Sequence, residues 1–227
     1  MTELIVALDH HDLGDAQALA KSIGDRASAF KVGHTLFTAH GPEAILEIAQ
    51  HGRVFCDLKL HDIPNQVTGS AAELTRLGVW MFTVHASGGA EMVAAAVRAA
   101  KAGTPPALVA AVTVLTSLSA DALEGVGQGE KVQEQVLRLA TLAVDAGATA
   151  LVCSPQEVAL LRERFPTGPK LVVPGVRPPG SETGDQARVA TPREAAQAGA
   201  DFIVVGRPIT GATEPLAVVE AVLEELR

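Results

Sequence analysis

The chain has 227 residues, of which 48% are hydrophobic and 19% are charged, and its formal net charge at pH 7 is −8. This composition excludes an intrinsically disordered chain, and the lack of any basic block or stripe argues against a nucleic-acid-binding surface. Because eight-stranded α/β barrels start at roughly 200 residues, the length suffices for one such unit, and we expect residues 1–227 to form a single domain.

Short apolar runs alternate with longer amphipathic stretches along the whole chain. The predicted strands are Leu4–Asp9, Ala29–Gly33, Val54–Leu60, Met81–Ala86, Leu108–Leu115, Ala150–Ser154, Lys170–Gly175 and Phe202–Arg207. The predicted helices are Asp15–Ile23, Pro42–His51, Gln66–Leu77, Ala90–Lys101, Lys131–Ala146, Pro155–Arg164, Pro192–Ala198 and Pro215–Leu226. Strands that are apolar on both faces and alternate with helices predict a parallel sheet. Eight such units predict an α/β fold of the (β/α)₈ TIM-barrel type, and an open doubly wound sheet is the alternative.

A few charged residues lie inside or at the carboxyl ends of predicted strands rather than on helices. Asp9 ends the first strand, Lys31 lies in the second, and Asp57 and Lys59 lie in the third. Because side chains alternate along a strand, Asp57 and Lys59 share one face, which Lys31 reaches from the neighbouring strand. A structural ion-pair network explains any one of these residues. However, all four lie at or near the carboxyl ends of the strands, where barrels carry their active sites. This position favours a functional cluster.

A second cluster of candidate residues follows the seventh and eighth predicted strands. The segment 174–186 is rich in glycine and proline, which is typical of a loop that covers a site. The eighth strand runs into Gly206 and Arg207. In TIM barrels these two loops often bind phosphate, and arginine makes bidentate contacts to it. A surface loop with an ordinary arginine is the alternative interpretation.

Residues 57–65, with the sequence Asp-Leu-Lys-Leu-His-Asp-Ile-Pro-Asn, resemble the signature of the orotidine 5′-phosphate decarboxylase family. Weaker matches extend over nearly the whole chain, at residues 7–9, 30–33, 84–86, 112–117, 174–177 and 205–208. The resemblance implies decarboxylation of orotidine 5′-monophosphate to uridine 5′-monophosphate and CO₂ in pyrimidine biosynthesis. It also implies a TIM-barrel homodimer that uses no cofactor and no metal.

The same resemblance implies roles for individual residues. Lys59 would protonate C6 of the pyrimidine, flanked by Asp57 and Lys31, and Asp62 would act across the dimer interface. Asp9 and Lys31 would contact the ribose, and Thr116 and Ser117 the pyrimidine. The residues expected at the phosphate are Arg177, Gln186, Gly206 and Arg207. Further expected substrate contacts are Ile63, Gln66 and Pro174.

The chemistry is consistent with these residue types. Loss of CO₂ from C6 leaves a carbanion in the ring plane, and the chain has no dinucleotide or Walker motif for an electron-sink cofactor or nucleotide. An ammonium held beside C6 stabilises the anion and then delivers a proton. Two carboxylates beside Lys59 keep that ammonium charged.

Two alternatives and one departure from the family pattern stay open. Related Mg²⁺-dependent barrels, namely 3-keto-gulonate 6-phosphate decarboxylase and hexulose phosphate synthase, generally carry a glutamate where this chain has Lys31, a poor metal ligand. A non-catalytic nucleotide-binding barrel is expected to have lost Lys59 or its aspartates. Gln66 stands where the family usually has threonine, so its ribose contact is open. His61 and His85 receive no general-base role from the resemblance.

The sequence also bears on compartment. No apolar stretch reaches the roughly 20 residues that span a bilayer, and the N-terminus does not resemble a secretory signal peptide. Cys56 and Cys153 lie far apart in apolar runs without metal-ligand spacing, so we expect buried thiols. These features predict a cytoplasmic protein with no membrane association.

Overall fold

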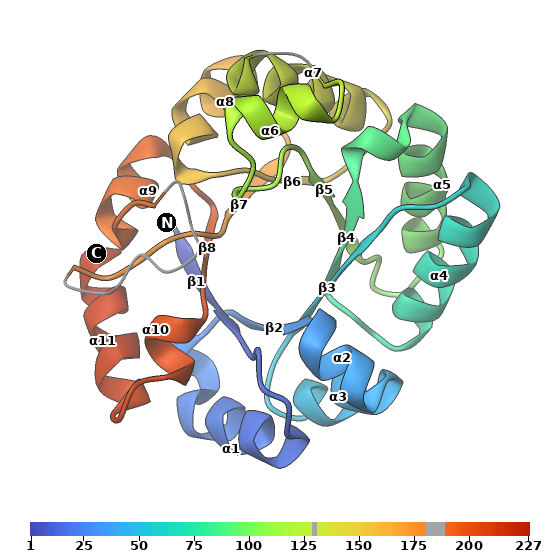
Figure 1. The fold of residues 1–227 in the computed structure, drawn as a ribbon. Coiled ribbons are helices and arrows are strands. Elements are labelled where there is room, and N and C mark those ends of the chain that lie inside the picture. The colour runs from blue at the N-terminus through green and yellow to red at the C-terminus, as the bar shows by residue number, and fades with distance from the viewer. Residues whose placement is uncertain (129–130, 180–188) are drawn as a thin grey trace.

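The computed structural model describes residues 1–128, 131–179 and 189–227. Its eight strands are β1 (Glu3–Ala7), β2 (Ala29–Gly33), β3 (Val54–Leu60), β4 (Met81–His85), β5 (Leu108–Val112), β6 (Ala150–Val152), β7 (Lys170–Val173) and β8 (Phe202–Val205). They form a closed parallel barrel in chain order, in which β8 pairs with β1 (Figure 1). The predicted (β/α)₈ barrel is therefore confirmed, and the open sheet is wrong.

Helices surround the barrel on the outside (Figure 1). They are α1 (Leu13–Ile23), α2 (His34–His40), α3 (Pro42–Ala49), α4 (Pro64–Arg76), α5 (Ala90–Lys101), α6 (Ala120–Gly125), α7 (Val132–Asp145), α8 (Val158–Arg164), α9 (Pro192–Ala198), α10 (Arg207–Thr210) and α11 (Pro215–Glu225). Three-residue 3₁₀ turns lie at Gly24–Arg26, Ala86–Gly88 and Pro155–Glu157. The eight predicted helices are present. Helices α2, α6 and α10 were not predicted, because four to seven residues give too few turns for a periodic pattern. The seven-residue α9 was predicted because Thr191 and Pro192 mark its start.

Several predicted strands end earlier than expected. The largest difference is at β5, which ends at Val112 rather than Leu115. The apolar residues after it belong to a loop at the mouth of the barrel, where Val114 is buried and Leu115 is exposed. An apolar run marks burial but does not distinguish a strand from a buried loop, which explains why the predicted strand is longer than β5.

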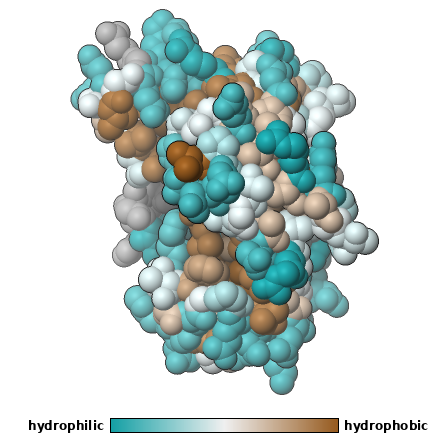
Figure 2. All heavy atoms as spheres, turned by 90° about the vertical axis from the view of Figure 1, so that its right-hand side faces the viewer, coloured by the Kyte–Doolittle hydropathy of each residue, from teal (hydrophilic) through white to brown (hydrophobic). Residues whose placement is uncertain are grey.

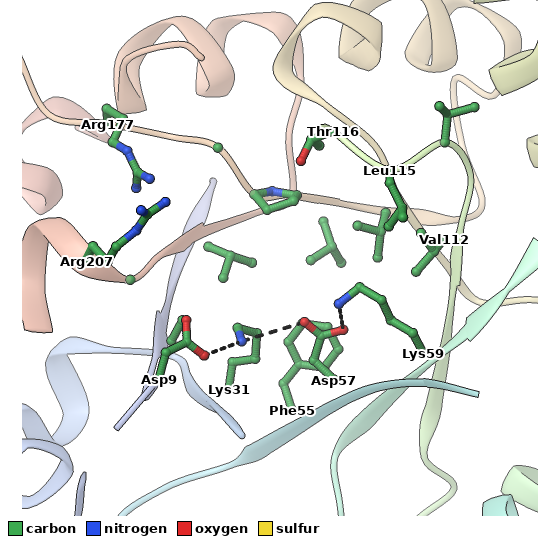
Figure 3. Close-up of a pocket in the computed structure, with 18 residues that line it drawn as sticks. Asp9, Lys31, Phe55, Asp57, Lys59, Val112, Leu115, Thr116, Arg177 and Arg207 are labelled. Atoms are coloured by element: carbon green, nitrogen blue, oxygen red, sulfur yellow. Dashed lines mark hydrogen bonds and ion pairs between the residues drawn. The ribbon is translucent and has the colours of Figure 1, made fainter. Parts of the chain in front are cut away.

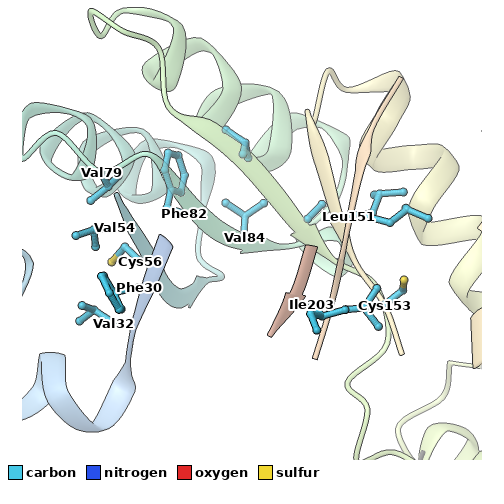
Figure 4. Close-up of a cluster of buried hydrophobic side chains, with 14 of the residues drawn as sticks. Phe30, Val32, Val54, Cys56, Val79, Phe82, Val84, Leu151, Cys153 and Ile203 are labelled. Atoms are coloured by element: carbon cyan, nitrogen blue, oxygen red, sulfur yellow. The ribbon is translucent and has the colours of Figure 1, made fainter. Parts of the chain in front are cut away.

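Alternate residues on the strands build two separate hydrophobic cores. The inner core fills the barrel with one face of each strand: Ile5, Ala7, Ala29, Phe55, Met81, Ala110, Ala150, Val172, Phe202 and Val204. The opposite face, including Val6, Phe30, Cys56 and Phe82, packs under the helices (Figure 4). Two buried faces on every strand explain why the strands read as continuous apolar runs.

Both cysteines are buried in the outer core, as expected from the sequence. Burial, followed by the negative charge of Asp57, raises the pKa of the Cys56 thiol to about 12, although Lys31 acts in the opposite direction. The thiol therefore stays protonated and behaves as an apolar group. Within the described segments, no helix combines the length and apolar character needed to cross a membrane.

The inward faces change from apolar to charged at the carboxyl ends of the first three strands. Asp9, two residues beyond the end of β1, continues the two-residue spacing of Ile5 and Ala7, and on β2 Lys31 follows Ala29. On β3, Asp57 follows Phe55. The apolar residues close the lower part of the barrel, so the charged side chains collect at one open end.

Candidate active site

A pocket of about 280 Å³ opens at the carboxyl ends of the strands (Figure 3). This volume lies near the lower end of the ~300–1,000 Å³ typical of small-molecule sites. The pocket is lined by Ala7, Asp9, Lys31, Phe55, Asp57, Lys59, Val112, Val114, Leu115, Thr116, Val152, Val172, Pro174, Gly175, Arg177, Val204, Gly206 and Arg207. Apolar side chains form its floor and one wall, while charged groups lie at two opposite sides.

One side holds four alternating charges, which we call the lysine–aspartate array: Asp9, Lys31, Asp57 and Lys59. Lys31 Nζ lies 3.0 Å from Asp9 Oδ1 and 3.7 Å from Asp57 Oδ2. Lys59 Nζ donates to Asp57 Oδ1 at 2.9 Å. The array thus runs from β1 across β2 to β3 without two like charges as direct neighbours (Figure 3).

Asp57 is the electrostatic centre of this array. Its side chain is only 14% exposed. Burial by itself raises the pKa of the carboxyl group. The charges of Lys31 and Lys59 and hydrogen bonds from Lys59 and Thr83 outweigh burial and bring the pKa below its ordinary value of 3.8. Asp57 is therefore a carboxylate at neutral pH, and its negative charge favours the ammonium form of the adjacent Lys59.

Lys59 reaches this position through an irregularity in β3. Cys56 pairs with Phe82 and Leu60 pairs with Val84, so residues 57–59 all lie opposite the single residue Thr83. Lys59 has a φ of +50°, a left-handed conformation that costs a non-glycine residue about 1–2 kcal/mol. Simple alternation of side chains thus does not describe this strand, although the side chains of Asp57 and Lys59 both point into the pocket (Figure 3). Backbone strain beside a charged cluster is typical of functional sites.

The opposite side of the pocket carries two guanidinium groups, which we call the arginine pair: Arg177 and Arg207. Both point into the pocket (Figure 3). Burial, followed by the positive charge of Arg207, lowers the pKa of Arg177. The Nε of Arg177 is buried and has no hydrogen-bond partner among the described residues. Two like charges directed at one space, with an unsatisfied donor, are suited to a bidentate anion such as phosphate.

Comparison with known proteins identifies the family of this barrel. The profile of the orotidine 5′-phosphate decarboxylase / HUMPS family matches residues 2–222. The chain belongs to this family. Among its relatives, the orotidine 5′-phosphate decarboxylase of Anaeromyxobacter sp. (strain K) is 53% identical over 220 residues, which cover 96% of each chain. That of Halorhodospira halophila is 48% identical over 224 residues, covering 98% of this chain and 95% of the relative.

Solved structures of the orotidine 5′-phosphate decarboxylase / HUMPS family resemble the present fold over its whole length. A crystal structure of orotidine 5′-phosphate decarboxylase from Lactobacillus acidophilus matches with a TM-score of 0.88 and 38% identity, and the match covers 100% of both chains. One from Pyrococcus horikoshii OT3 matches with a TM-score of 0.79 and 26% identity, over 99% of both chains. The family resemblance expected from residues 57–65 is therefore confirmed.

The structure brings most of the residues predicted from the family resemblance into one pocket. Those that line it are Asp9, Lys31, Asp57, Lys59, Thr116, Pro174, Arg177, Gly206 and Arg207. Gly206 lies against the first strand, where an added Cβ would be 3.3 Å from the Cβ of Ala7. The same Cβ would lie 3.4 Å from Asp9 Oδ2, so glycine permits the close approach of this segment to Ala7 and Asp9.

Other predicted site residues lie elsewhere. Asp62, Ile63 and Gln66 are exposed on the segment after β3 and do not line the pocket of this single chain. Asp62 Oδ1 accepts a hydrogen bond from the Ile63 N–H at 2.6 Å. Ser117 is exposed and does not line the pocket either. Gln186 lies outside the described residues.

The sequence analysis missed Thr83, which is buried against the array. Its hydroxyl accepts a hydrogen bond from the Lys59 N–H at 2.8 Å and donates one to Asp57 Oδ1 at 3.0 Å. Thr83 lies two residues after Met81, which belongs to the inner core. A polar residue at this inward position of β4 was the available signal, but threonine is common in strands and does not stand out.

The two histidines near the array form a ring pair. The centroids of His61 and His85 are 5.2 Å apart. Burial, followed by the nearby charges of His61 and Lys59, lowers the pKa of His85 to about 4. His85 is therefore neutral at pH 7. Across residues 1–128, 131–179 and 189–227, no group of three or more His, Cys, Asp or Glu side chains is arranged to hold a metal ion.

Proposed function

We propose that this chain decarboxylates orotidine 5′-monophosphate to uridine 5′-monophosphate, with Lys59 as the group that stabilises and then protonates C6. The observation that carries the proposal is the position of the Lys59 ammonium, 2.9 Å from the buried carboxylate of Asp57 and facing the pocket. The named relatives with 53% and 48% identity support the same reaction. Decarboxylation moves negative charge from the carboxylate onto C6, and an ammonium held beside C6 stabilises the charge in that new position.

The proton moves in the second half of the reaction. The bond between C6 and the carboxylate breaks, CO₂ leaves, and the electron pair stays on C6. Lys59 then transfers a proton from Nζ to C6 and becomes a neutral amine, which solvent reprotonates. Asp57 holds the Lys59 ammonium in place, and Lys31 in turn holds Asp57. These side chains therefore need to move little as negative charge develops on C6.

The arginine pair is proposed to bind the 5′-phosphate. Arg177 and Arg207 lie across the pocket from Lys59, so a nucleotide anchored there extends its base toward Lys59 (Figure 3). Asp9 and Lys31 form the end of the array that lies nearer to the arginine pair, where the ribose is expected (Figure 3). Binding energy from the phosphate then orients the ring for reaction. Thr116, which lines the pocket, is proposed to contact the base, and contacts from Pro174, Gly206, Ser117 and Gln186 belong to the same proposal.

The Mg²⁺-dependent reaction of related barrels is less well supported by the donor set. The ammonium of Lys31 occupies the space between the carboxylates of Asp9 and Asp57, at 3.0 and 3.7 Å. A divalent cation would have to displace this ammonium, because both are positively charged and would compete for the same carboxylates. We therefore propose a reaction that needs neither metal nor cofactor.

The proposal includes a homodimer in which Asp62 completes the array of the partner subunit. Ile63, next to Asp62, is a large apolar side chain that is 63% exposed. A shallow depression lined by residues 61–64 and residues 87–88 adjoins it. Figure 2 views the molecule from the side of α4 and α5, where brown and pale residues lie among hydrophilic ones. A symmetric interface here would cover Ile63 and bring Asp62, and with it Ile63 and Gln66, toward the second active site.

A cytoplasmic location, suited to the two buried thiols, is also part of the proposal.

An ultraviolet assay with orotidine 5′-monophosphate tests the activity. We expect turnover that survives excess chelator and that is far slower with orotidine, which lacks the phosphate. No turnover of the nucleotide would overturn the proposal. Turnover of 3-keto-gulonate 6-phosphate that disappears with chelator would favour the Mg²⁺-dependent alternative.

Mixed dimers test the sharing of Asp62. Asp62→Ala and Lys59→Ala are each expected to inactivate the enzyme, but a hybrid dimer contains one intact site, with Lys59 from one subunit and Asp62 from the other. Refolding a 1:1 mixture should therefore restore about a quarter of the wild-type activity for random pairing of symmetric subunits. No recovery, with hybrid dimers present, would contradict the shared site.

A further inference from the structure

We propose that Thr83 is a positioning residue for the catalytic lysine, an assignment that rests on the proposed decarboxylase function. Thr83 does not line the pocket and is 1% exposed. Its hydroxyl nevertheless contacts both Lys59 and Asp57, the two residues at the centre of the array. It therefore acts on the reaction through other residues and not by touching substrate.

The hydrogen bonds of Thr83 form a closed ring. The main-chain N–H of Lys59 donates to Thr83 Oγ1 at 2.8 Å, and Oγ1 donates to Asp57 Oδ1 at 3.0 Å. Lys59 Nζ closes the ring by donating to the same Oδ1 at 2.9 Å. The direction of each bond is determined, because a carboxylate only accepts and an amide N–H only donates. One hydroxyl thus links the main chain of Lys59 to the end of its own side chain.

The irregularity in β3 explains why a side chain is needed at this point. Residues 57–59 lie opposite Thr83 alone, so the regular β3–β4 hydrogen bonds are interrupted. The Lys59 N–H is directed at the Thr83 hydroxyl and not at a strand carbonyl group. A buried amide without a partner is unfavourable, and the left-handed conformation of Lys59 adds to that cost. The Thr83 hydroxyl accepts the hydrogen bond of this amide in place of the main-chain carbonyl group that a neighbouring strand normally supplies.

The same contact holds the acceptor of the ammonium in place. Asp57 Oδ1 receives Thr83 from one direction and Lys59 from another, which leaves the carboxylate little freedom to rotate. Since small displacements of a reacting group cost large factors in rate, a hydroxyl that fixes both partners is expected to act on turnover more than on binding.

Two pairs of variants separate the hydroxyl from the rest of the side chain. Thr83→Val keeps the shape of threonine, and Thr83→Ser and Thr83→Ala differ from each other only in the hydroxyl group. We expect kcat to fall about 10- to 100-fold in Thr83→Val and Thr83→Ala, from the loss of one hydrogen bond to a charged group. The kcat of Thr83→Ser should stay within about 3-fold of wild type, because serine keeps the hydroxyl group. The dissociation constant of uridine 5′-monophosphate, measured by calorimetry, should change less than 3-fold, roughly the scatter of a single neutral contact.

Thr149→Val provides a matched structural control. Thr149 also accepts a hydrogen bond from a strand amide, the N–H of Val109 at 2.9 Å, at the far end of the barrel. Its removal is expected to lower the denaturant midpoint as Thr83→Val does, with kcat unchanged. If Thr149→Val lowers kcat as much as Thr83→Val, or if Thr83→Val retains wild-type kcat, the positioning role is wrong.

Amide hydrogen exchange gives a readout that does not depend on turnover. The Lys59 N–H should exchange faster in Thr83→Val and Thr83→Ala than in wild type or Thr83→Ser, and unchanged exchange would overturn the proposal. If Thr83→Val does not fold, the serine–alanine pair decides both measurements. A wild-type chain without decarboxylase activity would refute the proposed function, whereas an active wild type with an equally active Thr83→Val refutes only the role of Thr83.

Discussion

The two charged sides of the pocket are built in opposite ways. In the lysine–aspartate array, each ammonium lies within 4 Å of a carboxylate, and the charges alternate. In the arginine pair, two guanidinium groups face the same space, and the positive charge of Arg207 helps to lower the pKa of Arg177. The first arrangement is electrically balanced before substrate arrives, whereas the second gains stability when an anion enters.

This difference matches the demands of the proposed reaction. Charge at C6 exists only transiently, so the groups that face it must already be in position, and mutual pairing holds them there. The phosphate carries its charge throughout, so two like charges that repel each other gain from its binding. We therefore expect changes in the array to act chiefly on kcat and changes in the arginine pair on KM as well.

The largest effect is expected for Lys59→Ala. Loss of both the electrostatic contact to C6 and the proton donor should lower kcat by about 10⁴-fold or more. Binding of uridine 5′-monophosphate should be much less affected. Lys170→Ala is the matched control, because Lys170 also pairs with an aspartate, Asp201 at 2.9 Å, but at the amino end of the barrel. Steady-state kinetics of both variants measure the difference, and a Lys59→Ala enzyme within tenfold of wild type would refute the role of the array.

Arg207→Ala should have the next largest effect. Loss of a bidentate, charge-assisted contact to phosphate is expected to lower kcat/KM for the nucleotide by about 10²- to 10³-fold. With orotidine as substrate, the same change should have little effect, because the contact partner is missing. The exposed Arg138 on α7 supplies an Arg138→Ala control. An equal loss with both substrates would show that Arg207 does not act through the phosphate.

Gly33→Ala should disturb the balanced side without removing any charge. An added Cβ would lie 2.7 Å from Lys31 Nζ and 3.1 Å from Asp9 Oδ1, so the ammonium must move. We expect kcat/KM to fall by about tenfold, since displacement of a positioned group by less than an ångström costs this order of rate. Gly69→Ala on α4, where an added Cβ meets no atom within 4 Å, is the control. Unchanged kinetics in Gly33→Ala would mean that the Lys31–Asp9 contact tolerates displacement.

The smallest effect concerns stability near the array. His85 has a pKa of about 4 in the fold against an ordinary value of 6.5, owing to burial first and then to His61 and Lys59. Between these values the unfolded chain binds the proton more readily, so the free energy of unfolding falls as the pH drops from 6.5 toward 4. His85→Gln should reduce this fall, by on the order of 1 kcal/mol once solvent screening is allowed for.

Urea denaturation at pH 4.5 and pH 7 measures the effect of His85→Gln. Asp57, whose pKa in the fold is lowered from 3.8, stays ionised in the folded protein over this range. His11→Gln, at an exposed position, is the control. If His85→Gln and wild type lose the same stability between the two pH values, His85 is not buried as a neutral group.

Much of this molecule is predictable from local patterns. Eight apolar strands that alternate with amphipathic helices suffice to predict the barrel, because each unit must bury both faces of its strand. Residues 57–65 suffice to indicate the family, and the strand ends mark Asp9, Lys31, Asp57 and Lys59 as neighbours. These inferences depend on short-range spacing and on burial, which a linear sequence records directly.

Only the tertiary structure decided how those residues meet. The irregularity opposite Thr83, the left-handed Lys59 and the ring that Thr83 closes arise from pairing between strands, which no spacing within one strand encodes. The orientation of Arg177 toward Arg207 likewise depends on two loops that are separated by some 30 positions in the chain. The sequence determines which functional groups are present, whereas contacts between distant segments determine how these groups are arranged in the site.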